Sequence, residues 1–143
     1  RLWDAQSGKE LRQLIGHGRG VNSAAFAPDG LRVVTVSSDA TTRIWDAGTG
    51  KEQLPVKHEG GIWGVAFSPD GRQFATSGEN NGIQFWDAKS GKQSQEPLTT
   101  FSPMRSLAFS PDGRLIATCA VSEASARIWD IKSGEEVRRL TQE

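Results

Sequence analysis

The chain has 143 residues, with 17 Lys and Arg side chains balanced by 17 Asp and Glu side chains. A chain of this length can bury a core of its own, and its zero formal charge removes the electrostatic basis for binding nucleic acid or anionic membrane. A single cysteine, Cys119, excludes an internal disulfide framework and a zinc cluster. We therefore expect no nucleic-acid or membrane partner and no metal, and the lone thiol fits a reducing, cytoplasmic location.

Short apolar segments between turn signals follow one another along the chain, without the 3.6-residue period that would favour a long helix. Up to residue 57 the expected strands are 1–4 (RLWD), about 9–14, 21–26 (VNSAAF), 31–37 (LRVVTVS), 41–46 (TTRIWD) and 51–57 (KEQLPVK). Between the third and fourth of these, Pro28 fixes φ for a type I turn and Gly30 can adopt the left-handed conformation, which predicts a hairpin. The sequence thus predicts an all-β protein built from four-stranded units.

Three markers repeat along the chain in phase. The Trp-Asp pairs begin at Trp3, Trp45, Trp86 and Trp129, at spacings of 42, 41 and 43 residues. Pro-Asp-Gly triplets at 28–30, 69–71 and 111–113, and a glycine five residues after each Trp, keep the same period. A period of this length indicates a repeat architecture in which each unit is one supersecondary element.

This unit resembles a blade of the WD-repeat β-propeller family, in the style of bacterial WD-repeat arrays, and the resemblance covers the whole chain. It implies a partial β-propeller of three complete four-stranded antiparallel blades at 17–57, 58–99 and 100–143, preceded by an N-terminal half blade at 1–16. The first strand of each blade would lie at the central channel. The charged fourth strand would lie outside, where Lys, Glu and Pro protect an edge.

His17, Ser37 and Asp39 are the residue types of a nucleophilic triad. The resemblance implies instead a structural network, in which Asp39 accepts from His17, His17 bonds Ser37, and Ser37 accepts the indole N–H of Trp45. Thr35 lies on the same strand face as Ser37, so either hydroxyl can complete this network. Because a nucleophile needs an oxyanion site and a free hydroxyl, we expect no catalytic residue and no enzyme activity.

The next unit keeps only part of this pattern. His58 and Trp86 occupy the network positions, whereas Gly78 stands in place of the Ser and Asn80 in place of the Asp. We expect a partial network there.

The last unit departs further, with Thr100 in place of the His and Glu123 in place of the Asp. We expect Trp129 to be held by packing, with its N–H bonded to water or backbone. Cys119 lies in the apolar segment LIATCA and is expected to be buried.

A glycine-rich segment at 48–51 has the look of a phosphate-binding loop, but Glu52 stands where a Ser or Thr would bind magnesium. Its equivalents recur in every unit as a turn, so we expect no cofactor.

Members of the resembled family act mainly as binding platforms, which implies a non-catalytic protein- or peptide-binding scaffold that forms a segment of a larger propeller. Partners would dock on the loops at the start of the first strand and after the second. The corresponding positions are Asn22, Ser38, Trp63, Glu79, Arg105 and Ser122. The alternative is the regulatory or sensing part of a multidomain enzyme, such as a kinase or nucleotide hydrolase, whose catalytic domain lies outside these residues.

Three and a half blades would leave two inter-blade faces uncovered, since propellers close with about four to eight blades. We expect these faces to take up missing blades from a parent chain or from another copy. By itself the chain is expected to form an open arc that associates through its ends.

Overall fold

The computed structural model describes residues 1–79, 82–100, 102–120 and 122–141, and thirteen strands lie within these ranges. They are β1 (Leu2–Trp3), β2 (Glu10–Arg12), β3 (Val21–Phe26), β4 (Arg32–Ser37), β5 (Thr41–Asp46), β6 (Glu52–Lys57), β7 (Ile62–Phe67), β8 (Gln73–Gly78), β9 (Ile83–Asp87), β10 (Met104–Phe109), β11 (Leu115–Ala120), β12 (Ser125–Asp130) and β13 (Glu136–Thr141). The described residues include no helix that is long and apolar enough to cross a membrane.

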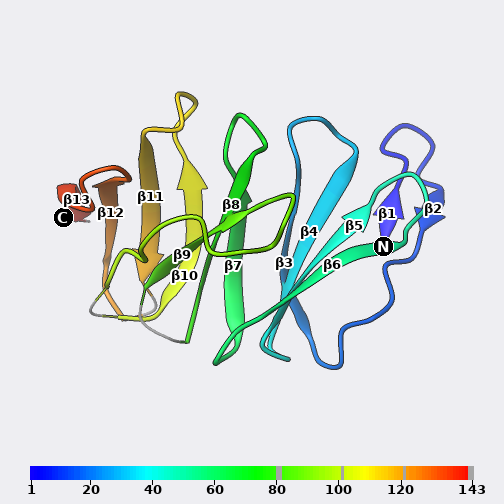
Figure 1. Cartoon of the computed structure of the whole chain (residues 1–143), viewed down its shortest axis with the longest axis horizontal. Helices are drawn as coiled ribbons and strands as arrows, with labels where there is room; N and C mark the ends of the chain where they lie inside the picture. The colour runs from blue at the N-terminus through cyan, green and yellow to red at the C-terminus, as the bar shows by residue number, and fades with distance from the viewer. Residues whose placement is uncertain (80–81, 101, 121, 142–143) are drawn as a thin grey trace.

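The strands form four antiparallel sheets that stand side by side in chain order, with the two termini at opposite ends of the row (Figure 1). We call them the half blade (β1–β2), the first blade (β3–β6), the middle blade (β7–β9) and the last blade (β10–β13). The predicted all-β class and partial propeller are confirmed. In the middle blade the fourth position is taken by the segment 93–98, which meets β9 through two isolated bridges, Trp86↔Gln93 and Ile83↔Leu98.

The Pro-Asp-Gly turns form the hairpins that the sequence predicts. Gly30, Gly71 and Gly113 all have φ near +70°, a conformation that glycine adopts without strain. The Gly30 amide donates to the carbonyl of Ala27 at 2.9 Å, and the Asp29 carboxylate accepts from the amide of Leu31 at 2.9 Å. Each turn therefore returns the chain directly into the second strand of its blade.

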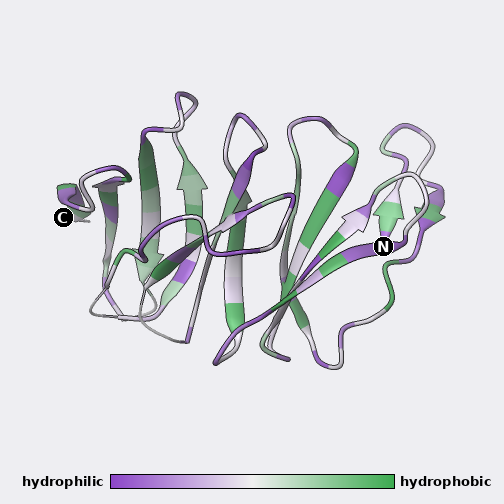
Figure 2. Ribbon diagram, viewed as in Figure 1, coloured by the Kyte–Doolittle hydropathy of each residue, from purple (hydrophilic) through white to green (hydrophobic). Residues whose placement is uncertain are grey.

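The core lies between neighbouring blades rather than within one sheet. One cluster, which includes Val34, Ile44 and Phe74, joins the first and middle blades, and a second, which includes Phe85 and Ile116, joins the middle and last blades. Apolar residues accordingly concentrate on the strands and polar residues on the connecting turns (Figure 2). The middle blade is thus covered on both faces.

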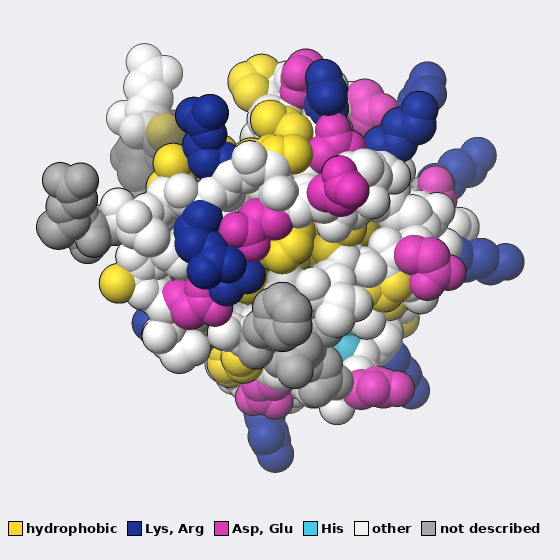
Figure 3. Space-filling model, turned by 90° about the vertical axis from the view of Figure 1, so that its left-hand side faces the viewer, with side chains coloured by type: hydrophobic (Ala, Val, Ile, Leu, Met, Phe, Trp, Pro, Cys, Tyr) yellow, Lys and Arg dark blue, Asp and Glu magenta, His cyan; other side chains and the backbone are white. Residues whose placement is uncertain are grey.

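The first blade and the last blade each keep an open face. At the N-terminal end Val21 and Phe26 of β3 are 54% and 59% exposed. At the other end, Val137 and Leu140 of β13 are exposed. Figure 3, which looks at this end of the molecule, shows hydrophobic side chains interspersed with charges of both signs. The expectation that Cys119 is buried is wrong: along β11 burial alternates, and Cys119 shares the exposed face with Ala117.

Candidate functional site

A hydrogen-bonded chain of side chains ties the first blade together. Trp45 Nε1 donates to Thr35 Oγ1 at 2.8 Å, and the same hydroxyl lies 2.7 Å from His17 Nε2. His17 Nδ1 lies 3.1 Å from Asp39 Oδ2. With the Thr35 oxygen accepting from the indole, its proton is free to bond His17 Nε2, which leaves Nδ1–H for the carboxylate.

The hydroxyl of this chain is Thr35 and not Ser37, which corrects the bonds expected for Ser37. Register explains the difference. Trp45 lies opposite Val33, so Thr35 is its diagonal neighbour on the same face, whereas Ser37 is two residues further along β4. The hydroxyl of Ser37 instead accepts from the amide of Asp39 at 3.0 Å and helps to form the turn after β4.

Asp39 is held ionised by the groups around it. Its carboxylate accepts from the hydroxyl of Thr41 at 2.6 Å and from the amide of Gly18 at 2.8 Å. Burial by itself would raise the pKa of Asp39, but these hydrogen bonds and that of His17 outweigh it and place the pKa well below its usual value. The carboxylate therefore stays charged and fixes the orientation of the His17 ring.

The same Thr–Trp bond recurs in the other two blades. Trp86 Nε1 donates to Thr76 Oγ1 at 2.8 Å, and Trp129 Nε1 donates to Thr118 Oγ1 at 3.0 Å. The expectation that the Trp129 N–H bonds water or backbone is therefore wrong. The signal was in the sequence, because Thr35, Thr76 and Thr118 repeat at 41 and 42 residues, in phase with the Pro-Asp-Gly triplets.

His58 faces a different set of partners from those of His17. Its Nε2 lies 2.8 Å from Thr42 Oγ1 of β5, and its Nδ1 lies 3.1 Å from Gln84 Oε1 of β9. Its ring packs edge-on against Trp86, at 4.9 Å between centroids. His58 thus links two blades, and the expected network partner Asn80 lies outside the described residues.

In the last blade an ion-pair cluster replaces the histidine network. The buried guanidinium of Arg127 donates to Glu123 at 2.6 Å and to Glu136 at 3.1 Å. Arg127, followed by a hydrogen bond from Ser102, lowers the pKa of Glu123 to about 2. Thr100, at the histidine position, donates to the carbonyl of Ser102. Glu123 therefore anchors the loop that precedes β12.

The Asp39–His17–Thr35 chain has the order of a nucleophilic triad, but its hydroxyl serves a structural role. Thr35 is 6% exposed, and its oxygen already accepts the indole proton. Attack on a substrate would require the loss of this bond. These hydrogen-bonded side chains link β4, β5 and the segment before β3 in one blade.

A shared hollow lies along the first strands of the three full blades. It has a volume of about 590 Å³ and is lined by Asn22, Ser23, Trp63, Arg105 and Ser106. Three of these residues occupy equivalent bulges. Two steps along β3, β7 and β10 match one step along the neighbouring strand, with the extra residue at Asn22, Trp63 and Arg105. A bulge re-aims its side chain out of the regular pleat.

The predicted docking positions after the second strands behave differently from one another. Ser38 accepts a hydrogen bond from Asn22 Nδ2 at 2.9 Å, so the two predicted residues of the first blade are in contact. Glu79 accepts from the amide of Gly61 at 3.0 Å. Ser122 is exposed. Asn22 also donates to the carbonyl of Ile62, so it fixes the first blade to the middle blade.

Over residues 8–46, 51–87 and 95–130 the sequence matches the family described as WD domain, G-beta repeat. The chain belongs to the WD-repeat family. It is 33% identical to Lissencephaly-1 homolog 1 of Paramecium tetraurelia over 58 residues, which are 41% of this chain and 14% of that protein. It is 45% identical to human WD repeat and SOCS box-containing protein 1 over 47 residues, 32% of this chain and 11% of that protein. To human Coronin-7 it is 37% identical over 54 residues, 38% of this chain and 6% of that protein.

WD-repeat chains of this kind are in general non-enzymatic scaffolds for protein interactions. The matching segment spans 14% or less of the length of each of these relatives. For this WD-repeat chain, the hollow at the three bulges is the part of the described surface where the predicted docking residues of different blades meet.

Proposed function

We propose that the chain is a non-catalytic scaffold that binds a protein or peptide segment in the hollow lined by Asn22, Trp63 and Arg105. One observation carries the proposal: three side chains of different chemistry, each on the bulge of its first strand, face one cavity of about 590 Å³. The repeat conserves the position of the bulge and varies the residue on it. Such variation on a fixed frame suits recognition.

The properties of these residues favour a partner over a purely structural role. Trp63 is only half-buried, and Arg105 is exposed, with no carboxylate of the described residues within 4 Å of its guanidinium. Trp and Arg are the residue types that most often dominate the energy of protein interfaces. A partner that covers the hollow would bury the indole and supply an acceptor for the arginine.

The test compares partner binding by the wild-type protein with that of Trp63→Ala and Arg105→Gln. Proteins that are retained by wild type and lost by both variants would be identified by mass spectrometry, purified, and titrated by calorimetry. We expect Trp63→Ala to weaken binding at least about tenfold, the loss typical of an interface anchor.

Arg72→Gln is the matched control, since Arg72 is an exposed arginine on a Pro-Asp-Gly turn and does not line the hollow. Thermal unfolding would verify that each variant keeps its fold. If both hollow variants bind every purified partner as tightly as wild type, the hollow is not the docking site.

The uncovered end faces suggest a second interaction. We propose that these faces take up further blades, from a parent chain or another copy, in a cytoplasmic assembly. The exposure of Val21 and Phe26 supports this proposal, because apolar faces of this kind are covered in stable assemblies.

A further inference from the structure

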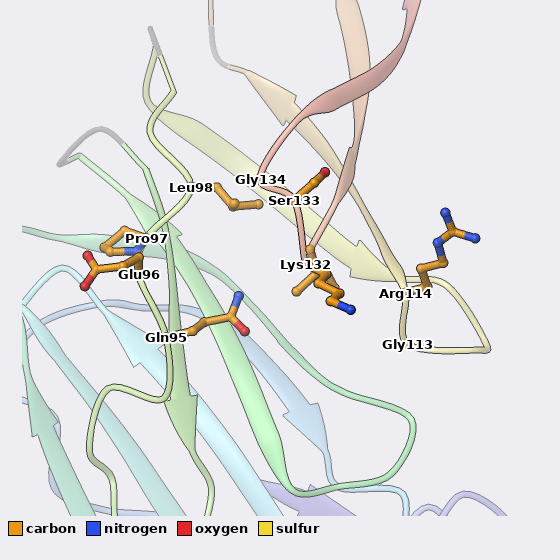
Figure 4. Close-up of a pocket in the computed structure, with 10 residues that line it drawn as sticks. Gln95, Glu96, Pro97, Leu98, Gly113, Arg114, Lys132, Ser133 and Gly134 are labelled. Atoms are coloured by element: carbon orange, nitrogen blue, oxygen red, sulfur yellow. The ribbon is translucent and has the colours of Figure 1, made fainter.

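A groove of about 540 Å³ separates the middle blade from the last blade on their outer side (Figure 4). One wall is the segment 95–98, and the other consists of the turns at 113–114 and 131–134. None of the residues that line it also lines the hollow. It is independent of the site proposed above.

The corresponding places between the earlier blades are filled by side chains. Between the first and middle blades, a Cβ added to Gly91 would lie 2.5 Å from Leu54 Cδ2 and 3.1 Å from Val56 Cγ2. Between the half blade and the first blade, a Cβ on Gly50 would lie 3.6 Å from the side chain of Arg12, whose Nε donates to the carbonyl of Gly48 at 2.7 Å. The repeat thus normally closes this junction with a side chain from the outer strand.

A second side chain, that of Arg32, also fills the junction between the first and middle blades; we call Leu54 and Arg32 the two plugs of this junction. Arg32 donates to the carbonyl of Gly71 at 3.1 Å and to that of Ala88 at 3.4 Å, and its guanidinium lies 5.7 Å from the centre of the Phe67 ring. Its equivalent in the middle blade is Gln73, which accepts instead from the hydroxyl of Ser94 in its own blade. The last blade therefore receives no such side chain from Gln73.

One additional residue in the outer segment opens the groove further. In the first blade Glu52 and Val56 pair with Trp45 and Thr42, four residues apart, whereas in the middle blade the matching bridges are at Gln93 and Leu98, five residues apart. Leu98 takes the place of Val56, but in the described part of the chain no side chain takes that of Leu54. A Cβ on Gly134 would meet only Leu98 Cδ2, at 3.5 Å, among the described residues.

The groove has an apolar floor and a basic rim. Leu98 is buried and Ile131 half-buried, and Pro97 lies beside them. Lys132 and Arg114 stand on the rim, Arg114 also pairing with Asp130 at 3.1 Å, while the side chain of Glu96 points away from the turn that carries Lys132 (Figure 4). No carboxylate of the described residues lies within 4 Å of the Lys132 ammonium.

We infer that this groove binds a short, extended, acidic peptide segment of a partner protein, which inserts one leucine-sized aliphatic side chain against Gly134. The chain itself shows the fit, because Leu54 fills the equivalent space against Gly91. Burial of the aliphatic side chain supplies the affinity, and the rim selects acidic residues beside it.

The probe is a fluorescein-labelled peptide, DEQLPVD, which keeps residues 52–56 of the first blade and adds acidic ends. Binding would be followed by fluorescence anisotropy. Two control peptides separate the two contributions: DEQAPVD removes the aliphatic side chain, and KEQLPVK reverses the end charges. We expect DEQAPVD to bind at least about tenfold more weakly, since it loses the burial of most of a leucine side chain.

Variants of the protein test the location. Gln73→Arg and Gln95→Leu restore the two plugs of the first junction and are expected to abolish binding of DEQLPVD. Lys132→Gln should weaken binding roughly two- to fivefold, as expected for an exposed charge pair. Lys89→Gln, at the same place in the turn of the filled junction, should leave binding unchanged, as should Trp63→Ala in the separate hollow.

The proposal is overturned if DEQLPVD does not bind wild type, if KEQLPVK or DEQAPVD binds as tightly, or if the two plugging variants bind like wild type. Gln73→Arg introduces a charged side chain from β8, and Gln95→Leu introduces an aliphatic one from the outer segment. Loss of binding in both variants, with unchanged thermal unfolding, would therefore place the peptide in the groove.

Discussion

At the scale of single residues, the threonine of the second strand is the common element of all three full blades. Thr35, Thr76 and Thr118 each accept the indole proton of the Trp on the next strand. What differs is the second partner of the hydroxyl. Thr35 also bonds His17, while the histidine of the middle blade bonds Thr42 instead. The first blade therefore has the most connected network.

This difference predicts an order of stability effects. Thr35→Val keeps the shape of the side chain but leaves two buried groups, the Trp45 N–H and His17 Nε2, without their partner, so we expect a loss of about 2 to 4 kcal/mol. Thr118→Val leaves one such group and should cost about 1 to 2 kcal/mol. Urea unfolding monitored by tryptophan fluorescence would measure both.

Thr99→Val serves as the control, since Thr99 is exposed and its substitution should change the unfolding free energy by less than about 0.5 kcal/mol. An equal or greater loss for Thr118→Val than for Thr35→Val would show that the histidine bond adds nothing.

Residue identity in the network could be only partly predicted from sequence. The repeat period indicated which segments contribute side chains to the hydrogen-bonded network. Strand alternation placed Thr35 and Ser37 on the same face of the strand. The choice between them depends on which residue of β4 lies opposite Trp45, and that register is set by the whole hairpin. The partners of His58 depend likewise on the neighbouring first blade, and those of Glu123 depend on how the strands of its own blade place Arg127 and Ser102. No local pattern reveals either set.

At the scale of elements, the turns and inner strands follow from local chemistry. Pro-Asp-Gly triplets, alternating apolar residues and polar outer strands correctly indicate the hairpins. The outer segment of the middle blade is the exception, since a continuous fourth strand was expected and two isolated bridges are found. One extra residue between these bridges breaks the pairing, and its structural effect was not evident from the period of 43 alone.

The connection between the first and middle blades contains a half-buried histidine, His58, which predicts a pH dependence. Burial lowers the pKa of His58, and the hydrogen bond to Gln84 opposes this only in part. In the unfolded chain the imidazole has its ordinary pKa of about 6.5. As the pH falls through this value, the unfolded state therefore binds more protons than the folded state does. The stability contributed by neutral His58 is present above this pH and is lost as the pH falls from about 6.5 towards the folded pKa.

Urea midpoints of wild type and His58→Gln, each measured at pH 7.5 and at pH 5.5, would isolate this effect. We expect wild type to lose more stability than the variant between the two values, because carboxylate titration is common to both. Identical shifts in the two proteins would mean that His58 protonates in the folded state as readily as in the unfolded chain.

At the scale of the whole molecule, the row of blades distributes burial unevenly. The middle blade has neighbours on both sides, whereas β3 of the first blade turns Val21 and Phe26 to solvent. Beside them lies a cavity of about 280 Å³, lined largely by apolar residues of β1, β3 and β4. This end face has the composition of an inter-blade surface, since the equivalent residues Ile62 and Phe67 of the middle blade are buried.

Exposure of such a face predicts concentration-dependent association of the 143-residue chain. Paired substitution of Val21→Ser and Phe26→Ser should raise the monomer fraction, because it removes the apolar surface that drives the contact. Sedimentation velocity over a concentration series would measure the change. Leu31→Ser is the control, as Leu31 is 68% exposed but follows the Pro-Asp-Gly turn and does not line this cavity. A wild-type chain that sediments as a monomer at every concentration would show that the uncovered face is stable in water.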